Sequence, residues 1–550
     1  MSLRADLSRV LADARDRAIT AGDLVIPAPT PLPEVGLERP AHPEHGDWAS
    51  NIAMQLAPVA RSTPMRIAET IVAHLEKPAS IDEIAVAPPG FLNIRLDPAW
   101  VAGQVGPIRD AGMSYGRGTV SDPGRINVEF VSANPTGPLH VGNARGAFVG
   151  DVLSRVLGAV GHEVGREYYF NDFGAQVLNL GLSVLARRNG TEIPEDGYRG
   201  SYVEELAAEL PAEVAQEAAG RPDDAARIVG AWATERVRTG IEASLARLGV
   251  HFDVWKEESS LHDGGWVERA VERLRASGHV YEADGATWFG STAFGDDKDR
   301  VIYRSNGLPT YFASDIGYVT EKLGRGFDEL IYIWGVDHHG TVARVRNAAE
   351  AMGYDRDAIR MLLIAWVRFV RDGVEISMSK RSGEFITLDE VLDEVGVDAA
   401  RWFFSSRAYT TGIDFDLELA KRQSNENPVY YVQYAHARAS SILRHAAEAG
   451  VAIDAGRTGE LLRHPAEQLL VHHLLDFPDA LATAAARRET HEVPRYAYEL
   501  ASAFSAFYRD CKVLTEDEAL SSARLALVDA TRSVLANALD LLGISAPASM

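Results

Sequence analysis

The sequence predicts an α/β fold: a Rossmann-type catalytic domain with a doubly wound parallel sheet, preceded by an α+β N-terminal domain and followed by an all-helical C-terminal domain. Short apolar, strand-like runs alternate with helical patterns from residue 126 to about residue 370, which is typical of a parallel sheet covered by helices. Beyond residue 425, apolar residues recur only at helical spacing. A chain of 550 residues is too long for one hydrophobic core, so several domains are expected.

The N-terminal domain is expected to span residues 1–115. Its first helix is predicted over residues 3–20, where Leu3, Leu7 and Leu11 fall on one stripe. A loop rich in proline and glycine follows, and then a short helical pattern and a strand-like run at residues 84–95. Turn-forming residues between positions 111 and 124 indicate a linker to the next domain.

The catalytic domain is predicted over residues 116–370. Charged helical stretches occupy much of residues 186–300, and we interpret that segment as an insertion. A connecting region is expected at residues 371–424 and a helical domain at residues 425–550, whose last helix ends at Gly543. The candidate strands of the parallel sheet are residues 126–131, 167–171, 329–336 and 361–367.

Composition limits the class of protein. One cysteine, Cys511, excludes a disulfide framework and a zinc site built from several cysteines. No apolar run approaches ~18 residues and the N-terminus lacks the apolar core of a signal peptide, so we expect a cytoplasmic protein without contact to membranes. The net charge of -23 argues at first sight against a nucleic-acid partner. That argument is weak, because local patches rather than net charge decide binding.

His140 lies in a proline- and glycine-rich turn between a strand-like run and a helical pattern. The first N–H groups of a helix have no partners within it, so such a turn is a natural anion site. His140 could donate to a phosphate or a ribose, and Gly142 leaves room for a nucleotide. The pattern His-x-Gly is weak, because 16 His and 47 Gly should produce it about once by chance. It also occurs at His262 and His338, and His140 alone could equally be a helix-capping residue.

A second run, Ser-Met-Ser-Lys-Arg-Ser-Gly at residues 377–383, follows the last candidate strand. A loop with Lys380 and Arg381 could close over a triphosphate and neutralise charge on a leaving pyrophosphate. On its own, such a run would be a solvated basic loop. In the same α/β domain as His140, it indicates a nucleotide site.

Acidic residues are expected at the same cleft. Tyr311 and Asp315 are four positions apart, hence on one face if helical. Asp337 follows the strand-like run 331–336, and ligands of open α/β sheets bind at the carboxyl ends of strands. Together with Glu129, these carboxylates suit a cationic substrate, although each alone could be a surface or capping acid.

Several stretches resemble one enzyme family. Residues 134–143 resemble the HIGH signature of class I aminoacyl-tRNA synthetases, and residues 377–381 resemble their KMSKS loop. Within that class the chain resembles the arginyl-tRNA synthetases from end to end. The stretches that carry this resemblance are residues 45–51, 129–134, 168–174, 311–315 and 427–438.

The resemblance implies an ATP-dependent ligase that converts L-arginine to arginyl-adenylate and transfers it to the 3′ end of tRNA(Arg), releasing pyrophosphate and AMP. Mg²⁺ would be bound through the ATP phosphates, with no metal site on the protein. A carboxylate facing the guanidinium would reject lysine, so no editing domain is expected. The implied residues are His140, Gly142, Asn143 and Lys380 for catalysis; His140, Gly142, His338, Met378 and Lys380 for ATP; and Glu129, Asn134, Tyr311, Asp315 and Asp337 for arginine.

The chain departs from the family pattern at two signature positions. Asn143 replaces the second histidine of HIGH, and Ser377 replaces the first lysine of KMSKS. Some relatives that lack this loop have a lysine just upstream of HIGH, where this chain has Gly137. Lys380 is therefore expected to be indispensable.

The helical domain would bind the anticodon and the N-terminal domain would contact the tRNA elsewhere. Tyr431, Tyr434 and Tyr508 are expected to stack on unpaired bases, although aromatic residues at helical spacing more often belong to a core. We expect a monomer whose partners are tRNA(Arg), L-arginine and ATP.

Two other functions stay open at this point. One is an adenylyl-transfer enzyme that works without tRNA, which the long helical domain disfavours. The other is a non-catalytic tRNA-binding relative, which should have lost His140, Lys380 or the acidic residues.

Overall fold

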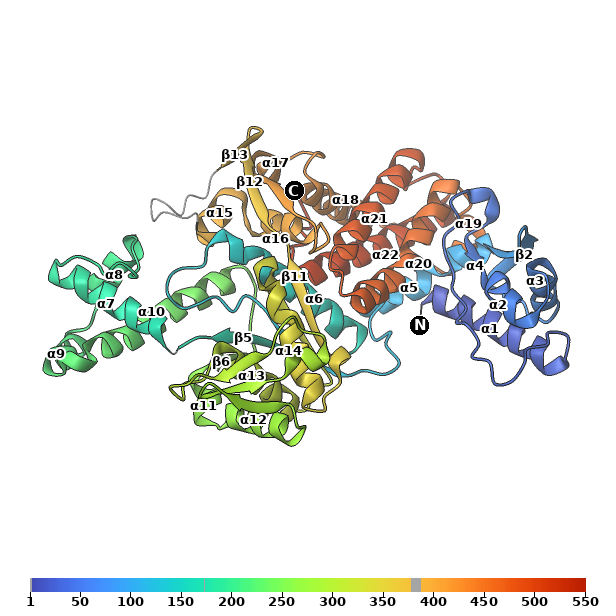
Figure 1. Ribbon diagram of the computed structural model, residues 1–550. Helices are drawn as coiled ribbons and strands as arrows, with labels where there is room; N and C mark the ends of the chain where they lie inside the picture. Colours follow the sequence, from blue (N-terminus) through green and yellow to red (C-terminus); the bar gives the residue numbers. More distant parts are fainter. Residues whose placement is uncertain (1, 173, 377–386) are drawn as a thin grey trace.

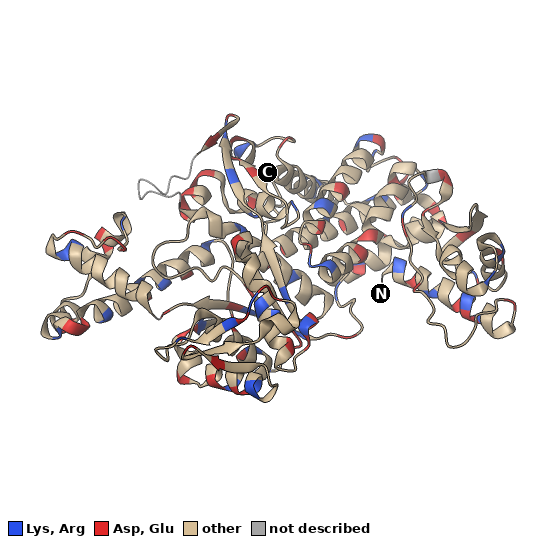
Figure 2. Cartoon of the chain, viewed as in Figure 1, with Lys and Arg blue, Asp and Glu red and all other residues tan. Residues whose placement is uncertain are grey.

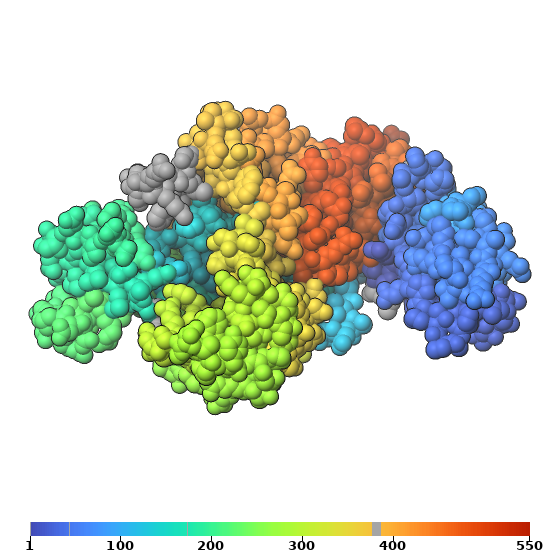
Figure 3. All heavy atoms as spheres, viewed as in Figure 1, coloured from blue at the N-terminus to red at the C-terminus, as the bar shows by residue number. Residues whose placement is uncertain are grey.

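The computed structural model describes residues 2–172, 174–376 and 387–550. The molecule is elongated, with the N-terminal domain at one end and a helical arm, residues 175–247, at the other (Figures 1 and 3). The parallel sheet lies between them, and the helical C-terminal domain separates the sheet from the N-terminal domain (Figure 1). The expected α/β class with two flanking domains is confirmed.

The N-terminal domain packs helices against a small antiparallel sheet, β1-β3-β2. Its first helix begins after Ser2, whose side chain accepts from Ala5 N, and ends at Gly22 with φ +83°. The elements are α1 (Leu3–Ala21), β1 (Trp48–Ser50), α2 (Ile52–Ala60), α3 (Pro64–Ala73), β2 (Ile81–Ala87) and β3 (Phe91–Leu96), followed by α4 (Pro98–Gly103) and α5 (Val105–Ala111).

Five parallel strands in the order β11-β10-β4-β5-β6 form the central sheet. The chain runs outward from β4 through α6 to β5 on one side, and from β10 to β11 on the other. The order therefore reverses between β4 and β10, and the carboxyl ends of these two strands form the switch point where ligands of such sheets bind. The elements are β4 (Arg125–Glu129), α6 (Val141–Val160), β5 (Glu163–Phe170), β6 (Val254–Glu257), α13 (Tyr311–Gly324), β10 (Glu329–Gly335), α14 (His339–Ala351) and β11 (Ile359–Ile364).

The segment interpreted as one insertion, residues 186–300, contains a strand of the central sheet. Strand β6 pairs in parallel with β5, so the segment is divided into two parts. The sequence analysis missed β6 because it has only four residues, Val-Trp-Lys-Glu, without an apolar run or a clear alternation. Before β6 lies the arm, α7 (Ala175–Asn189), α8 (Ser201–Glu209), α9 (Ala212–Gly220) and α10 (Ala225–Arg247); after it lie α11 (Ser259–Asp263), α12 (Trp266–Ala276), β7 (Val280–Ala283), β8 (Ala286–Phe289) and β9 (Arg300–Tyr303).

The predicted strand 361–367 is also two strands. Strand β11 ends at Ile364, and the chain then enters a separate small sheet of order β13-β12-β14. This sheet and its helices form the connecting region after the catalytic sheet. Its elements are β12 (Val367–Arg371), β13 (Val374–Ile376), α15 (Leu388–Val395), α16 (Val397–Ser405), β14 (Ile413–Asp416) and α17 (Leu417–Lys421).

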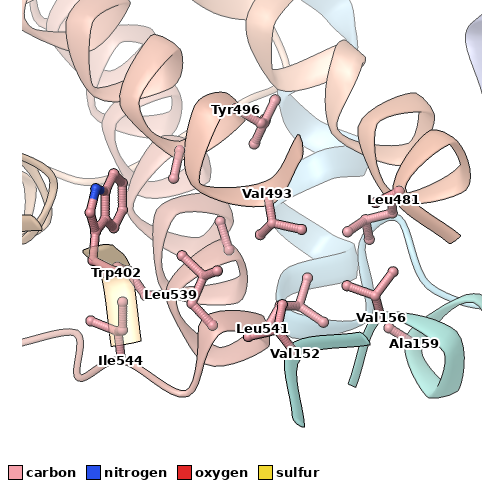
Figure 4. Packing of buried hydrophobic residues seen from close by; sticks show 14 of the residues in the cluster. Val152, Val156, Ala159, Trp402, Leu481, Val493, Tyr496, Leu539, Leu541 and Ile544 are labelled. Carbon is pink, nitrogen blue, oxygen red and sulfur yellow. The ribbon is translucent and has the colours of Figure 1, made fainter. Parts of the chain in front are cut away.

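The C-terminal domain is helical, as expected, and packs directly on α6. Val152 and Val156 of α6 lie beside Leu481, Leu539 and Leu541 (Figure 4). Gly543 caps the last helix with φ +65°, as predicted. The helices are α18 (Pro428–Glu448), α19 (Thr458–Leu461), α20 (Pro465–Arg487), α21 (Glu492–Asp510) and α22 (Glu518–Leu542).

A buried ion pair strengthens this junction. Arg401 of α16 and Asp151 of α6 form a salt bridge in which neither side chain is exposed. Arg401 also donates to the carbonyl oxygens of Leu542 (2.6 Å) and Leu248 (2.6 Å). One guanidinium thus joins the connecting region, the nucleotide-side helix, the arm and the end of the last helix.

Acidic and basic side chains are interspersed along all parts of the chain (Figure 2). None of the helices in the described residues is long and apolar enough to cross a membrane.

Two glycines of α6 provide a matched test of its packing. A Cβ at Gly150 would lie 2.2 Å from Cγ of the buried Phe130, whereas a Cβ at Gly158 would meet nothing within 4 Å. We expect Gly150→Ala to destabilise the fold by about 1–3 kcal/mol through overpacking, and Gly158→Ala to stabilise it by about 0.5–1 kcal/mol. Urea unfolding followed by circular dichroism measures both, and equal shifts in the two variants would contradict this packing.

Candidate active site

The chain leaves β4 at Glu129, makes a loop, and enters α6 at His140. Val131 and Ser132 adopt positive φ values of +67° and +41°, which turn the loop sharply after the strand. At the helix entrance, Asn143 Oδ1 accepts from the backbone N of His140 at 3.3 Å. The residue that replaces the second HIGH histidine therefore fixes the first turn of the helix.

Gly142 allows the imidazole of His140 to lie across this first turn. A Cβ at position 142 would lie 2.8 Å from both Cε1 and Nδ1 of His140. Both residues are exposed, so the positive end of the dipole of a 20-residue helix faces a site that solvent and ligands can reach. The geometry is that of an anion site with an imidazole at its mouth.

Asp337 and His338 follow β10, the strand that pairs with β4. Both side chains are exposed, and His338 Nε2 lies 3.6 Å from Asp337 Oδ2. A Cβ at Gly335 would lie 2.3 Å from Asp337 Oδ1, so a side chain at position 335 would displace the Asp337 carboxylate from this position. Because β4 and β10 are parallel neighbours, this turn and the loop before α6 are at the same edge of the sheet.

Glu129 is buried, and both of its carboxylate oxygens have partners. Lys322 Nζ lies 2.5 Å from Oε2, and Ser132 Oγ donates to Oε1 at 3.2 Å. Lys322 has no exposed side-chain surface and lies 4.1 Å and 4.0 Å from the ring centroids of Tyr318 and Tyr332. Burial raises the pKa of Glu129, and the lysine opposes this shift. The charge of Glu129 is thus matched within the protein, so a substrate cation needs another carboxylate.

Asp315 is such a carboxylate. It lies one turn after Tyr311 on α13, as predicted, and Tyr311 is 71% exposed. Burial raises the pKa of Asp315 to about 7, with further contributions from the charges of Glu129 and Glu258, and Arg344 only partly offsets them. Within the described parts of the chain, no lysine or arginine forms an ion pair with Asp315.

Glu258 is a further candidate that the sequence analysis did not name. It directly follows β6, at the same edge of the sheet, and is 6% exposed. Burial raises its pKa, whereas the Ser314 hydroxyl, His262 and Tyr169 favour its charged form. Among the residues described, no lysine or arginine pairs with it. Recognition of β6 as a sheet strand would have pointed to the acid at its carboxyl end.

His262, one of the other two His-x-Gly histidines, lies beside this acidic cluster. Its Nε2 is 3.4 Å from Ser314 Oγ, the residue that precedes Asp315. Asn134 lies on the exposed loop after β4, where its carbonyl accepts from Thr136 N at 2.8 Å.

Met378 and Lys380 lie outside the described residues, as do Ser377 and Arg381. The residues that follow this stretch contact the nucleotide-side loop directly. Thr387 forms an antiparallel bridge with His140, and Leu388 N donates to the Leu139 carbonyl at 3.0 Å.

Comparison with known proteins assigns each part of the chain. The model of the arginyl tRNA synthetase N terminal domain matches residues 2–96, and that of the DALR anticodon binding domain matches residues 432–550. The model of the class I (R) tRNA synthetase catalytic domain matches residues 113–197 and 221–406. The chain belongs to the arginyl-tRNA synthetases. It is therefore an arginine–tRNA ligase of class I, which charges tRNA with arginine and uses ATP as substrate.

Relatives of this arginyl-tRNA synthetase match it over its whole length. The arginine–tRNA ligases of Heliobacterium modesticaldum and Desulforudis audaxviator are 44% and 46% identical to it, covering 100% of this chain and 99% of theirs. The structure of Thermus thermophilus arginyl-tRNA synthetase matches with a TM-score of 0.81 at 26% identity, covering 100% of both chains. These matches favour the arginine–tRNA ligase over the two alternatives that the sequence left open, an adenylyl-transfer enzyme without tRNA and a non-catalytic tRNA-binding protein.

The three tyrosines named for tRNA binding occupy two places in the helical domain of the synthetase. Arg438 lies 4.6 Å and 4.7 Å from the ring centroids of Tyr434 and Tyr508, and Tyr508 is 44% exposed. Tyr431 is partly buried and donates to Ser505 Oγ at 3.0 Å.

The raised pKa of Asp315 predicts a pH-dependent effect on stability. Its usual value is 3.8, so the folded protein retains a proton that the unfolded chain releases, and the resulting stability is lost as the pH rises through about 7. Asp315→Asn stays neutral, so it should stabilise the ligand-free protein by an amount that grows from pH 5.5 to about 7 and then levels off. Thermal unfolding at several pH values measures this.

Asp296 is the control for this experiment, because the hydrogen bond from Arg300 lowers its pKa. Asp296→Asn should destabilise the protein throughout this range, since its carboxylate stays charged and paired well below pH 5.5. A destabilising Asp315→Asn at pH 8 would contradict the assignment.

Proposed function

We propose that ATP binds at the N-terminus of α6 and that arginine binds beside it, at the switch point between β4 and β10. The observation that carries this proposal is the pairing of β4 with β10, which brings the loop ending at His140 and the turn at Asp337 and His338 to one edge. In this arrangement His140, Gly142 and Asn143 hold the phosphates and adenosine, and His338 contacts the adenosine.

The arginine side chain points toward Asp315 and Glu258. No lysine or arginine of the described residues forms an ion pair with either carboxylate, whereas Glu129 is already paired with Lys322. A guanidinium presents a planar fork that can bridge two acids, and lysine cannot fill both. Glu129 and Asn134 then lie toward the α-amino group, with Tyr311 and Asp337 at the mouth of the site.

In the first step, a carboxylate oxygen of arginine attacks the α-phosphorus of ATP, the bond to the bridging oxygen breaks, and pyrophosphate leaves. A hydroxyl of the tRNA 3′ adenosine then attacks the activated carbonyl, loses its proton, and displaces AMP. The protein's part is mainly to orient the reactants and stabilise developing negative charge. The N–H groups of α6 and the imidazole of His140 do so from one side.

Lys380 is proposed to act from the other side, on the departing pyrophosphate, with Met378 beside the nucleotide. Support comes from the contacts of the residues just beyond: Thr387 bridges to His140 and Leu388 bonds to Leu139. Thr387 is seven positions after Lys380 in sequence, a span that a fully extended chain covers in about 25 Å at most.

Mg²⁺ would be bound through the ATP phosphates and would neutralise part of their charge. A hard cation fits the carboxyl edge of the sheet, where the Asp337 carboxylate is exposed. We further propose that the enzyme is a cytoplasmic monomer.

The domain limits proposed are 1–115, 116–370, 371–424 and 425–550. The helical domain binds the anticodon of tRNA(Arg), with Tyr434 and Tyr508 stacking on bases beside Arg438, and with Tyr431 nearby. The match of residues 432–550 to an anticodon binding domain supports this part. The N-terminal domain contacts the tRNA elsewhere.

Lys380→Ala tests the ATP site. We expect adenylate formation to fall by about 10²–10³-fold, because a charge stabilising the transition state is lost, with little change in the affinity for arginine. Arginine-dependent pyrophosphate exchange with tRNA present measures this. The control is Lys421→Ala, which removes an exposed ion pair with Glu418 and should leave the rate unchanged. A mild loss in Lys380→Ala would refute its role.

Glu258→Gln tests the arginine site. Loss of a charged hydrogen-bond acceptor should raise the KM for arginine roughly 10–100-fold while the KM for ATP stays unchanged, and discrimination against lysine should fall. The matched control is Glu257→Gln, since Glu257 is the exposed neighbour at the end of β6. Charging assays with arginine and lysine provide the readout. An unchanged KM for arginine in Glu258→Gln would remove this residue from the site.

A further inference from the structure

Arg145 lies in the second turn of α6, five residues after His140, and has no exposed surface. Burial lowers its pKa to about 10. In the described parts of the chain no carboxylate forms an ion pair with it, and its Nε has no hydrogen-bond partner. A buried cation without a counter-charge is costly, so packing alone does not account for it.

The two terminal nitrogens of Arg145 bind backbone carbonyls of two other segments. Nη1 donates to Ala365 and Nη2 donates to Ala408, each at 2.9 Å. Ala365 connects β11 to β12, and its N–H donates to the Tyr409 carbonyl at 2.9 Å. The guanidinium thus fastens α6 to the end of β11 and to the loop between α16 and β14.

These contacts lie on the path between the two ATP-binding segments. Strand β12 leaves Ala365 and leads through β13 to Ile376, four residues before Lys380. On the far side of the undescribed stretch, Leu388 is hydrogen-bonded to Leu139. Helix α6 therefore holds the base of the β12–β13 hairpin through Arg145, and the residue just before its N-cap holds Leu388.

We propose that Arg145 is a positioning residue that sets the start of α6 at His140 relative to the base of the β12–β13 hairpin, without touching ATP itself. This inference rests on the ATP site proposed above. The planar fork of arginine suits the task because it reaches two carbonyls at once, whereas lysine is a single point donor. Its buried charge adds to the positive end of the α6 dipole, which faces the triphosphate.

The test compares Arg145→Lys and Arg145→Met with the wild-type full-length enzyme, in pyrophosphate exchange with tRNA present. We expect kcat/KM for ATP to fall about 10–100-fold in both variants, because small misplacements of reacting groups are costly, while the KM for arginine changes less than about twofold. Arg524→Lys is the structural control. Arg524 is also largely buried and binds a carboxylate and a carbonyl, at 2.7 Å each, but lies within the helical domain.

Arg524→Lys should lower the unfolding temperature without changing the KM for ATP. A wild-type kcat/KM for ATP in Arg145→Lys would overturn the inference. It would also be overturned if kcat/KM fell by the same factor for ATP and for arginine. If Arg145→Met does not fold, Arg145→Lys decides alone. The variant His140→Ala distinguishes failure of the proposed ATP site from failure of the role of Arg145. Normal ATP kinetics in His140→Ala would contradict the ATP site itself. Impaired kinetics in His140→Ala together with normal kinetics in Arg145→Lys would contradict only the role of Arg145.

Discussion

The parallel pairing of β4 with β10 is the constraint on which the rest of the active site depends. In this register β4 ends at Glu129 opposite Tyr332, and β10 continues to Gly335, so the loop after β4 and the turn after β10 leave the sheet at the same edge. The two strands are about 200 residues apart in sequence, and the arm and the β7–β9 hairpins fold outside the sheet between them. Loss of this pairing would separate the histidine at the start of α6 from the acids that follow β10.

Some of the buried acids beneath this edge of the sheet form ion pairs with buried or partly buried cations, and others do not. Lys322 pairs with Glu129, and Arg325 pairs with Glu167 at 2.7 Å. These cations favour the charged forms of two acids within the sheet. Asp315 and Glu258 receive no such partner, and their raised pKa values reflect that deficit. In the arginine site proposed above, a bound cation would relieve this unfavourable acidic cluster, so selectivity for arginine would be linked to reduced stability of the empty site.

The sequence was sufficient where a feature depends on local pattern. The alternation of strands and helices predicted the parallel sheet, and the spacing of Tyr311 and Asp315 predicted their common helix face. The sequence pattern was insufficient where pairing with a distant strand decides whether a segment is a strand. Four residues with no clear periodicity become β6 because β5 offers a free edge, and without that strand Glu258 is only one acid among many. The apolar run at 361–367 gives no local sign that its two halves join different sheets. The break lies at Ala365, whose carbonyl accepts from Arg145 and whose N–H donates to the Tyr409 carbonyl, and both partners are distant in sequence.

Helix α6 begins at the proposed nucleotide site. Its middle packs against the helices of the C-terminal domain through Val152 and Val156, and Asp151 pairs with Arg401 of α16 (Figure 4). A helix of 20 residues is a rod about 30 Å long, and close-packed interiors compress little. A tilt of the C-terminal helices upon docking of a distant RNA loop would therefore be carried along this rod rather than absorbed at the junction. The same helix would then couple the helical domain to the position of the His140 imidazole.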